Sequence, residues 1–167
     1  FEMQMGTNHL GHFALTGQLI SLLKKTPKSR VVNVASIAHT SGNIDFDDLN
    51  WEKRKYKTWS AYGDTKLANL YFTYELSRKL GQNKGSPMVL ASHPGWTATD
   101  LQKHSGMANF MNIFLGQKVK VGALGGLRAA TDPTAKSGNY FGYPSMGGMK
   151  GHPVLVNSKD LSYNVDN

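Results

Sequence analysis

A tyrosine and a lysine stand four residues apart in Tyr62-Gly-Asp-Thr-Lys66, the spacing of two side chains on one face of a helix. A free phenol has a pKa near ~10 and is a poor acid or base at neutral pH. A positive charge one helical turn away favours the phenolate and lowers that pKa. Such a pair can exchange a hydroxyl proton while a hydride moves between a carbinol and a nicotinamide. Taken alone, the spacing is a weak signal and is more typical of an ordinary pair on a helix surface.

The surrounding pattern places this pair in an alternating series of helices and strands. Apolar residues recur at helical spacing in three segments, and the second of them stops at Gly81. Two short apolar runs are typical of strands buried on both faces. The expected helices cover residues 3–25, 58–80 and 118–131, and the expected strands cover residues 30–36, 88–92 and 139–143. Residues 37–57 are polar and irregular.

This alternation predicts an α/β fold with a parallel sheet, right-handed crossovers and helices on its faces. Ligands of such sheets bind beyond the carboxyl ends of the strands. Ser36 ends one expected strand and His93-Pro94-Gly95 follows another, so we expect them at one functional edge. Ser36 could hold a substrate oxygen by a hydrogen bond. The alternative is that Ser36 caps the turn after its strand.

The composition of the chain limits which classes of partner we expect it to bind. The 167 residues are interpreted as a single domain, 1–167, with 19 Lys and Arg against 11 Asp and Glu and a net charge of +8. That balance favours an anionic partner, such as a phosphorylated cofactor, an acidic membrane surface or nucleic acid. The charges are scattered and no nucleic-acid-binding motif accompanies them, so we expect no nucleic acid. The absence of cysteine excludes disulfides and thiolate chemistry. No metal site is expected, because His9 and His12 have no evident carboxylate partner.

Four motifs together carry a family resemblance. They are Asn8-His9-Leu10-Gly11-His12-Phe13, Arg30-Val-Val-Asn-Val-Ala-Ser36, Tyr62-xxx-Lys66 and His93-Pro94-Gly95-Trp96-Thr97-Ala98-Thr99. In this order they resemble the short-chain dehydrogenase/reductase family, and most closely its retinol-dehydrogenase-like and WW-domain-oxidoreductase-like branch. The likeness covers nearly the whole chain. It implies the catalytic, C-terminal portion of a Rossmann-type doubly wound parallel sheet.

The resemblance also implies a role for each matching residue. Tyr62 would be the general acid/base, and Lys66 would lower the pKa of the phenol and bind the nicotinamide ribose. Ser36 would hydrogen-bond the substrate oxygen. Asn8 would hold a water in a proton relay with the lysine, although it could instead satisfy the helix backbone at a bend. The cofactor would be contacted by Tyr62, Lys66, Pro94, Gly95, Trp96, Thr97 and Thr99, with Val34 lining the cleft.

Parts of the family pattern do not occur in this sequence. There is no Thr-Gly-xxx-Gly-x-Gly loop to hold a pyrophosphate and no Asn-Asn-Ala-Gly segment. The chain begins at Phe1 without a methionine, so we expect the natural polypeptide to start upstream. The positive net charge slightly favours NADP over NAD. A cytoplasmic location is the expectation, since no signal peptide or membrane-spanning stretch is evident.

Two further segments bear on partners and substrate. The stretch between Ser36 and Tyr62 resembles a loop that lies over the dimerisation surface of other family members, so both a monomer and a homodimer stay open. After the Pro94-Gly95 turn comes an apolar segment that would cover the substrate, with Met107, Phe110, Met111, Ile113, Phe114 and Leu115. An apolar lid suits a hydrophobic alcohol, aldehyde or ketone.

Alternatives to the lid and to the enzyme remain open at this stage. The lid residues could simply pack in the interior, or could touch a membrane surface beside Lys103, Lys118 and Lys120. Two functions follow from the motifs: a nicotinamide-dependent oxidoreductase, or a non-catalytic relative that acts as a binding or scaffolding module. The joint presence of Asn8, Ser36, Tyr62 and Lys66 favours the enzyme.

Overall fold

The sequence folds into alternating helices and strands in the order expected. The computed structural model describes residues 1–81, 85–95, 118–145 and 147–163. Its helical elements are α1 (Met3–Met5), η1 (Gly6–Leu10), α2 (Gly11–Lys25), η2 (Ile37–Ser41), η3 (Phe46–Asp48), α3 (Thr58–Leu80), α5 (Val119–Gly122), α6 (Leu124–Thr131) and η5 (Asp160–Tyr163). Its strands are β1 (Arg30–Val34), β2 (Met88–Ser92), β3 (Tyr140–Gly142) and β4 (Val154–Leu155).

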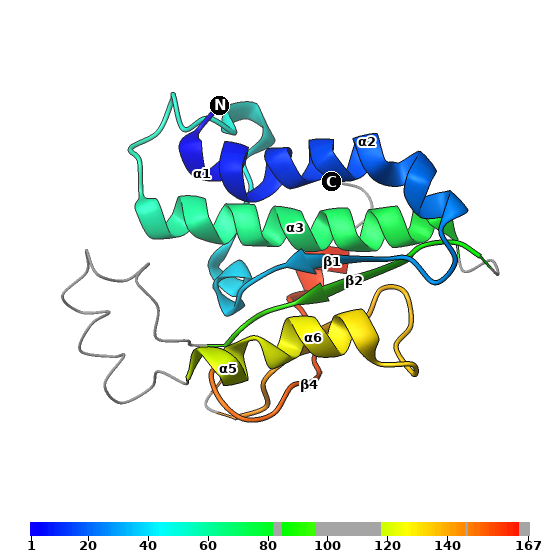
Figure 1. Cartoon of the computed structure of the whole chain (residues 1–167). Helices are drawn as coiled ribbons and strands as arrows, with labels where there is room; N and C mark the ends of the chain where they lie inside the picture. Colours follow the sequence, from blue (N-terminus) through cyan, green and yellow to red (C-terminus); the bar gives the residue numbers. More distant parts are fainter. Residues whose placement is uncertain (82–84, 96–117, 146, 164–167) are drawn as a thin grey trace.

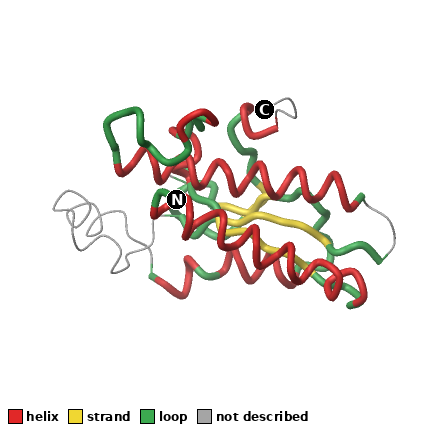
Figure 2. The backbone as a smooth tube through the Cα atoms, turned by 90° about the horizontal axis from the view of Figure 1, so that it is seen from above, coloured by secondary structure: helices red, strands yellow, loops and turns green. Residues whose placement is uncertain are grey.

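The strands form one sheet in the order β1-β2-β3-β4, with helices on both faces. β1, β2 and β3 are parallel to one another. Figure 1 shows α2 and α3 on one side of the sheet and α5 and α6 on the other. Seen from above, the strands run in the same general direction as the long helices (Figure 2). The predicted α/β class, with a doubly wound sheet, is therefore confirmed.

The last strand departs from the predicted parallel arrangement. β4 runs antiparallel to β3, pairing Phe141 with Leu155 and Gly142 with Val154. The connection between them, residues 143–153, contains an antiparallel bridge between Ser145 and Lys150, and Gly147 and Gly148 adopt positive φ angles of 66° and 90°. A parallel pair would instead need a longer crossover, of about a dozen residues or more.

Two of the expected helices are real but less uniform than their periodicity suggests. The segment over residues 3–25 contains a stretch of π-helix, η1, between α1 and α2. The segment over residues 118–131 is divided at Ala123 into α5 and α6. By contrast, α3 and β2 have the expected bounds. Among the described residues, no helix is both long and apolar enough to cross a membrane.

The core lies on both faces of the sheet because successive side chains of β2 point in opposite directions. Ala91 packs with Ala35, Leu70 and Tyr140 on the side of α3. Leu90 packs on the side of α6, in a cluster with Ala129, Ala135 and Phe141. The apolar run Met88–Ser92 thus forms a strand covered on both faces, as expected.

A close backbone approach brings the loop after β1 against the start of α3. Gly63 follows Tyr62, and a Cβ atom at Gly63 would lie 2.9 Å from the carbonyl oxygen of Ala38 and 2.9 Å from Oγ of Ser41. Real Cβ atoms do not approach other atoms so closely. The missing side chain of Gly63 therefore allows the loop that begins at Ser36 to pack beside Tyr62.

Gly63→Ala tests this approach, with Gly17→Ala as a matched helical control. Alanine in a helix is normally more stable than glycine by up to about 1 kcal/mol, and Gly17 in α2 has open space where its Cβ would stand. We expect Gly17→Ala to be neutral or stabilising, and Gly63→Ala to lower the free energy of unfolding by about 1–3 kcal/mol. Urea unfolding measures both. A gain in stability at both sites would contradict the close approach.

Candidate active site

A cavity of about 1520 Å³ opens at the carboxyl ends of β1, β2 and β3. Its walls include Ser36 after β1, His93, Pro94 and Gly95 after β2, and Tyr62 from α3. The structure therefore brings together the residues that the sequence places at one functional edge. The site lies where ligands bind in open parallel sheets.

Ser36 both caps a helix and faces the catalytic tyrosine candidate. Its Oγ accepts a hydrogen bond from the backbone N–H of Ala38 at 3.2 Å, so it is the N-cap of η2. The hydroxyl also lies close enough to the phenol of Tyr62 to lower the pKa of that phenol by hydrogen bonding. The capping alternative is thus correct, and it is compatible with a role in the site because the cap fixes where the hydroxyl points.

The environment of Tyr62 differs from the expectation in one respect. Burial raises the pKa of Tyr62, and the hydrogen bond with Ser36 acts in the opposite direction. Lys66 lies close, with Nζ 5.4 Å from the centre of the Tyr62 ring. Desolvation of the phenolate is the larger of the two effects on the pKa of Tyr62, so the net shift is upward. Because its pKa is raised, Tyr62 is a neutral phenol at pH 7.

Lys66 is buried, with 8% of its surface exposed. Its ammonium group donates a hydrogen bond to the carbonyl oxygen of Val34, at the end of β1, at 3.2 Å. Burial lowers the pKa of Lys66, because the charged form loses water. An ammonium has three N–H donors, and Val34 uses one of them.

Val34 contributes through its backbone rather than in the expected way. Its side chain is 51% exposed, because β1 is the outer strand, and it does not line the cavity. The placement of Val34 beside the cofactor stays a prediction. The carbonyl oxygen instead accepts hydrogen bonds from Lys66 and from Asn69, the latter at 3.0 Å.

Asn8 joins the site through Asn69. The side-chain amide of Asn69 also donates to the carbonyl oxygen of Asn8 at 3.0 Å, while Asn8 Nδ2 donates to Oγ1 of Thr65 at 3.3 Å. Asn8 lies within η1, and its contacts with Thr65 and Asn69 join this element to α3. The alternative that Asn8 satisfies helix backbone with its side chain receives no support from these bonds. A polar chain thus runs from Lys66 through Val34 and Asn69 to Asn8.

Asn69 is the residue that sequence reasoning missed. It is 2% exposed, and its Oδ1 lies at hydrogen-bond distance, 3.0 Å, from Nδ1 of His9. A usable signal was present: Tyr62, Lys66, Asn69 and Thr73 recur every three or four residues and so share one face of α3. Buried polar side chains on such a face need hydrogen-bond partners, and the carbonyl oxygen of Val34 at the end of β1 accepts from two of them.

The remaining cofactor-contact candidates divide into two groups. Pro94 and Gly95 line the cavity, and Gly95, with a φ of 65°, donates its N–H to Nδ1 of His93 at 3.1 Å. Trp96, Thr97, Thr99 and the apolar lid segment lie outside the described residues. His93 is 3% exposed and packs against Tyr140 and Tyr143, so it supports the turn from within the core.

Comparisons with known proteins agree with this geometry. No family model matches the sequence. Retinol dehydrogenase 13 from Homo sapiens is 50% identical over 119 residues, covering 70% of this chain and 35% of the relative. Short-chain dehydrogenase TIC 32 A, chloroplastic, from Brassica napus is 37% identical over 154 residues, covering 84% of this chain and 48% of the relative. The chain belongs to the short-chain dehydrogenase/reductase family. Its resemblance is to the retinol-dehydrogenase-like branch, as the motifs indicated.

Solved structures support the same assignment. A putative uncharacterized protein from Mycobacterium paratuberculosis superposes with a TM-score of 0.74 at 39% identity, covering 99% of this chain and 54% of that one. The RhlG/NADP complex from Pseudomonas aeruginosa, at 21% identity and a TM-score of 0.57, shows the shared fold. This short-chain dehydrogenase/reductase chain spans about a third to a half of the length of these curated relatives.

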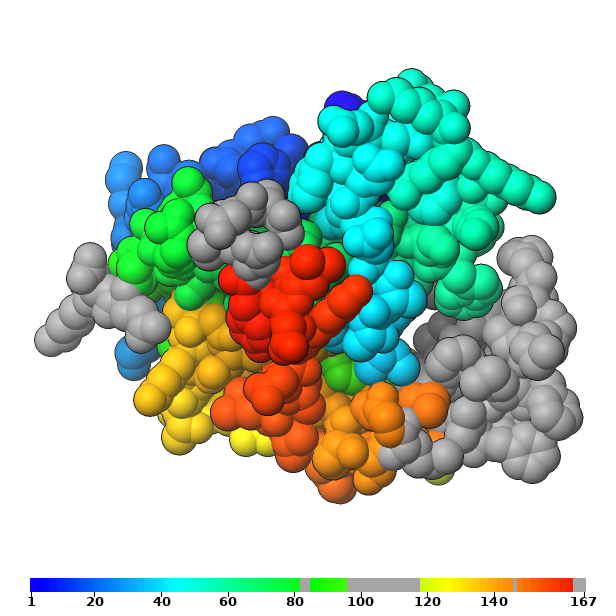
Figure 3. All heavy atoms as spheres, turned by 180° about the vertical axis from the view of Figure 1, so that it is seen from behind, coloured from blue at the N-terminus to red at the C-terminus, as the bar shows by residue number. Residues whose placement is uncertain are grey.

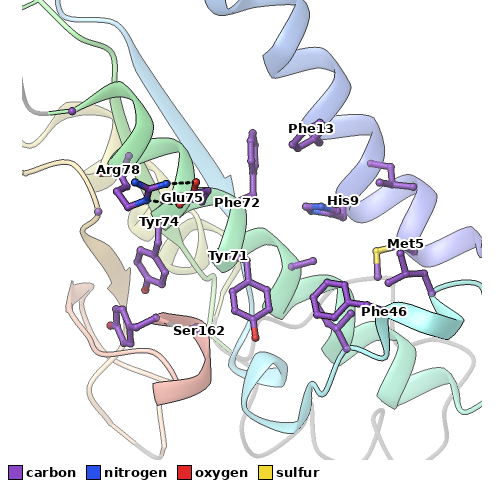
Figure 4. A pocket seen from close by; sticks show the side chains of 18 residues that line it. Met5, His9, Phe13, Phe46, Tyr71, Phe72, Tyr74, Glu75, Arg78 and Ser162 are labelled. Carbon is purple, nitrogen blue, oxygen red and sulfur yellow. Dashed lines mark hydrogen bonds and ion pairs between the residues drawn. The ribbon is translucent and has the colours of Figure 1, made fainter. Parts of the chain in front are cut away.

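A second cavity, of about 680 Å³, lies away from this site on the dehydrogenase chain (Figure 4). His9 from η1 and Phe13 from α2 face Phe72 and Tyr71 from α3, and the ion pair of Glu75 with Arg78 lies at one end. Asn8, Ser36, Tyr62 and Lys66 are not among its lining residues. Of these four residues, Ser36 and Tyr62 line the cavity at the strand ends, whereas Asn8 and Lys66 line neither cavity.

Acid should destabilise this site through its buried histidine. Burial lowers the pKa of His93 to about 4, against 6.5 for a free histidine. Between about pH 6.5 and pH 4, His93 is therefore protonated in the unfolded chain but remains neutral in the folded chain. His93 costs no stability above about pH 6.5, and stability falls by about 3 kcal/mol as the pH drops to about 4. We expect urea unfolding to show this loss, and His93→Asn to make it shallower. An unchanged pH dependence in His93→Asn would contradict the assignment.

Proposed function

We propose that the protein is an NAD(P)-dependent oxidoreductase that interconverts a hydrophobic alcohol with the corresponding aldehyde or ketone. The observation that carries the proposal is the convergence of Ser36 and Tyr62 on one cavity, close enough for Ser36 to lower the pKa of the Tyr62 phenol, with Lys66 one turn further along α3. Membership in a family whose relatives include retinol dehydrogenases supports it.

The residues at the strand ends fit the nicotinamide end of a dinucleotide. The ammonium of Lys66 is fixed by Val34 and retains donors for ribose hydroxyls. Pro94 and Gly95 provide a cavity wall next to Ser36 and Tyr62. When bound, the nicotinamide supplies or accepts the hydride at the carbinol carbon. The net charge of +8 suits the extra phosphate of NADP, with NAD as the alternative.

Proton transfer is then assigned to the chain's own side chains. In the direction of reduction, the hydroxyl of Ser36 donates a hydrogen bond to the substrate carbonyl oxygen. Tyr62 gives its phenolic proton to that oxygen as the carbon receives the hydride. The charge of Lys66 stabilises the resulting phenolate, which regains a proton from water. Oxidation uses the same steps in reverse, so Tyr62 must first be a phenolate.

The walls of the cavity support an apolar substrate. Trp59 and Val119 line it and are 60% and 61% exposed, so their apolar surfaces remain available for contact. Ile37 and Pro144 add further apolar surface. Burying such surface against a hydrocarbon substrate contributes roughly 25 cal/mol per Å². A hydrophobic alcohol or carbonyl compound is therefore the substrate class that we propose.

Tyr62→Phe in the natural gene product tests the proposed function, with Tyr71→Phe as the matched control on the same helix. Removing the proton donor should lower kcat for NADPH-dependent reduction of a hydrophobic aldehyde by about 10²–10⁴-fold. Tyr71 lies outside the site and its variant should keep wild-type kcat. Equal rates for wild type and Tyr62→Phe would instead support the scaffolding alternative.

The direction of the Tyr62 pKa shift predicts opposite pH dependences for the two reaction directions. Burial keeps the phenol protonated at neutral pH, so reduction should proceed without added base and slow only in alkaline solution. Oxidation needs the phenolate, so its kcat/KM should rise as the pH increases above 7. Steady-state rates from pH 6 to 10 measure both. An oxidation rate that falls with rising pH would contradict the role of Tyr62.

A further inference from the structure

His39 makes two hydrogen bonds that join distant parts of the chain. It is 3% exposed and lies in η2, three residues after Ser36. One ring nitrogen, Nδ1, lies 2.6 Å from the backbone carbonyl oxygen of Ser36. The other, Nε2, accepts the backbone N–H of Lys159 at 3.1 Å. The ring therefore connects the active-site serine with the C-terminal segment.

These two contacts determine the protonation of the ring. A carbonyl oxygen can only accept, so Nδ1 must carry a proton and donate it to Ser36. A backbone N–H can only donate, so Nε2 must be unprotonated. His39 is thus the neutral Nδ1–H tautomer. A second proton on Nε2 would break the bond to Lys159 and place charge near its ammonium group.

The C-terminal segment is itself held firmly. Nζ of Lys159 donates to the carbonyl oxygen of Gly42 at 2.9 Å, beyond the end of η2. The hydroxyl groups of Ser158 and Tyr74 are 2.7 Å apart, and the rings of Tyr74 and Tyr163 stack at 4.7 Å. Figure 3 shows this segment, in red, beside the cyan segment that follows β1. The segment therefore rests on α3 and η2 together.

Packing leaves the His39 ring little room to move. It meets the ring of Tyr140 in a T-shaped contact at 5.8 Å between ring centres, and Tyr140 also contacts His93, which precedes the Pro94-Gly95 turn. The Ser36 hydroxyl, in contrast, accepts a long cap bond from Ala38 at 3.2 Å. The Ser36 carbonyl oxygen accepts both the backbone N–H of His39 at 3.1 Å and the bond from the His39 ring at 2.6 Å, and the ring bond is the shorter of the two.

We propose that His39 is a positioning residue that fixes Ser36 for hydrogen bonding to the substrate oxygen and transmits the placement of residues 157–163 to the active site. The inference rests on the proposed function, because it concerns how Ser36 meets the substrate. On this proposal, His39 and residues 157–163 affect turnover through the position of Ser36, without touching the reacting atoms.

Two substitutions at His39 separate positioning from packing. In His39→Asn the amide nitrogen stands where Nδ1 stood and can still donate to Ser36, whereas His39→Leu fills space without donating. In the natural gene product, we expect His39→Leu to lower kcat by about 10–100-fold, as a displaced catalytic group does, with KM for the cofactor changed by less than about threefold. His39→Asn should recover most of kcat. The exposed His152, changed to Asn, is the matched control and should behave as wild type.

The outcomes that overturn the proposal are distinct from those that overturn the proposed function. Wild-type kcat in His39→Leu, or equal losses in the Leu and Asn variants, would exclude a positioning role. If His39→Leu does not fold, the proposal is tested by kcat of the Asn variant and by nitrogen-15 spectra of the wild-type imidazole. These spectra must show the neutral Nδ1–H tautomer at pH 7. A charged ring or the Nε2–H tautomer would refute the link. A wild-type protein without turnover would refute the proposed function and, with it, this role.

Discussion

The carbonyl oxygen of Val34 is the point on which the site depends. It ends β1 and accepts hydrogen bonds from both Lys66 and Asn69 of α3. Buried polar groups are costly unless they find partners, so this pairing fixes the height and rotation of α3 on the sheet. Once α3 is fixed, Tyr62 lies one turn before Lys66 at the mouth of the cavity. The positions of the catalytic candidates therefore follow from one main-chain acceptor.

Two further contacts position the segments on either side of α3. The missing side chain of Gly63 lets the loop of residues 36–42 approach, which places the Ser36 hydroxyl beside Tyr62. On the other side, Asn69 reaches the carbonyl of Asn8 and ties the π-helical segment η1 to the same helix. Local π-helical turns often occur at functional sites. Three of the four family motifs, those around Asn8, Ser36 and Tyr62, are thus held by α3 and its neighbours.

The sequence could predict the elements whose patterns are long and regular. α3 and β2 have the expected bounds, because Gly81 stops the helix and the apolar run of β2 is interrupted by Pro94. β4 has two residues, which is too short for any periodic signal. The π-helical turn leaves the apolar spacing of residues 3–25 nearly unchanged, so it is invisible in the sequence. Motif positions predicted Ser36, Tyr62 and Pro94-Gly95 at one cavity.

What the sequence could not predict depends on contacts between distant residues. The bonds of Asn69 and His39 join positions 35 to 120 residues apart, and no local pattern encodes them. The direction of the Tyr62 pKa shift was also missed, because it depends on how deeply packing buries the phenol. Sequence spacing showed the positive charge of Lys66 but not the desolvation that opposes it.

The central claim is that Ser36 and Tyr62 act together on one substrate oxygen. A double-mutant cycle of Ser36→Ala and Tyr62→Phe, read from kcat in the natural gene product, tests it most directly. Groups that act as a unit show strongly non-additive losses. The account predicts that the double variant is no more than a few-fold slower than Tyr62→Phe alone. Losses that multiply in the double variant would show that the two side chains act independently, and would contradict the account.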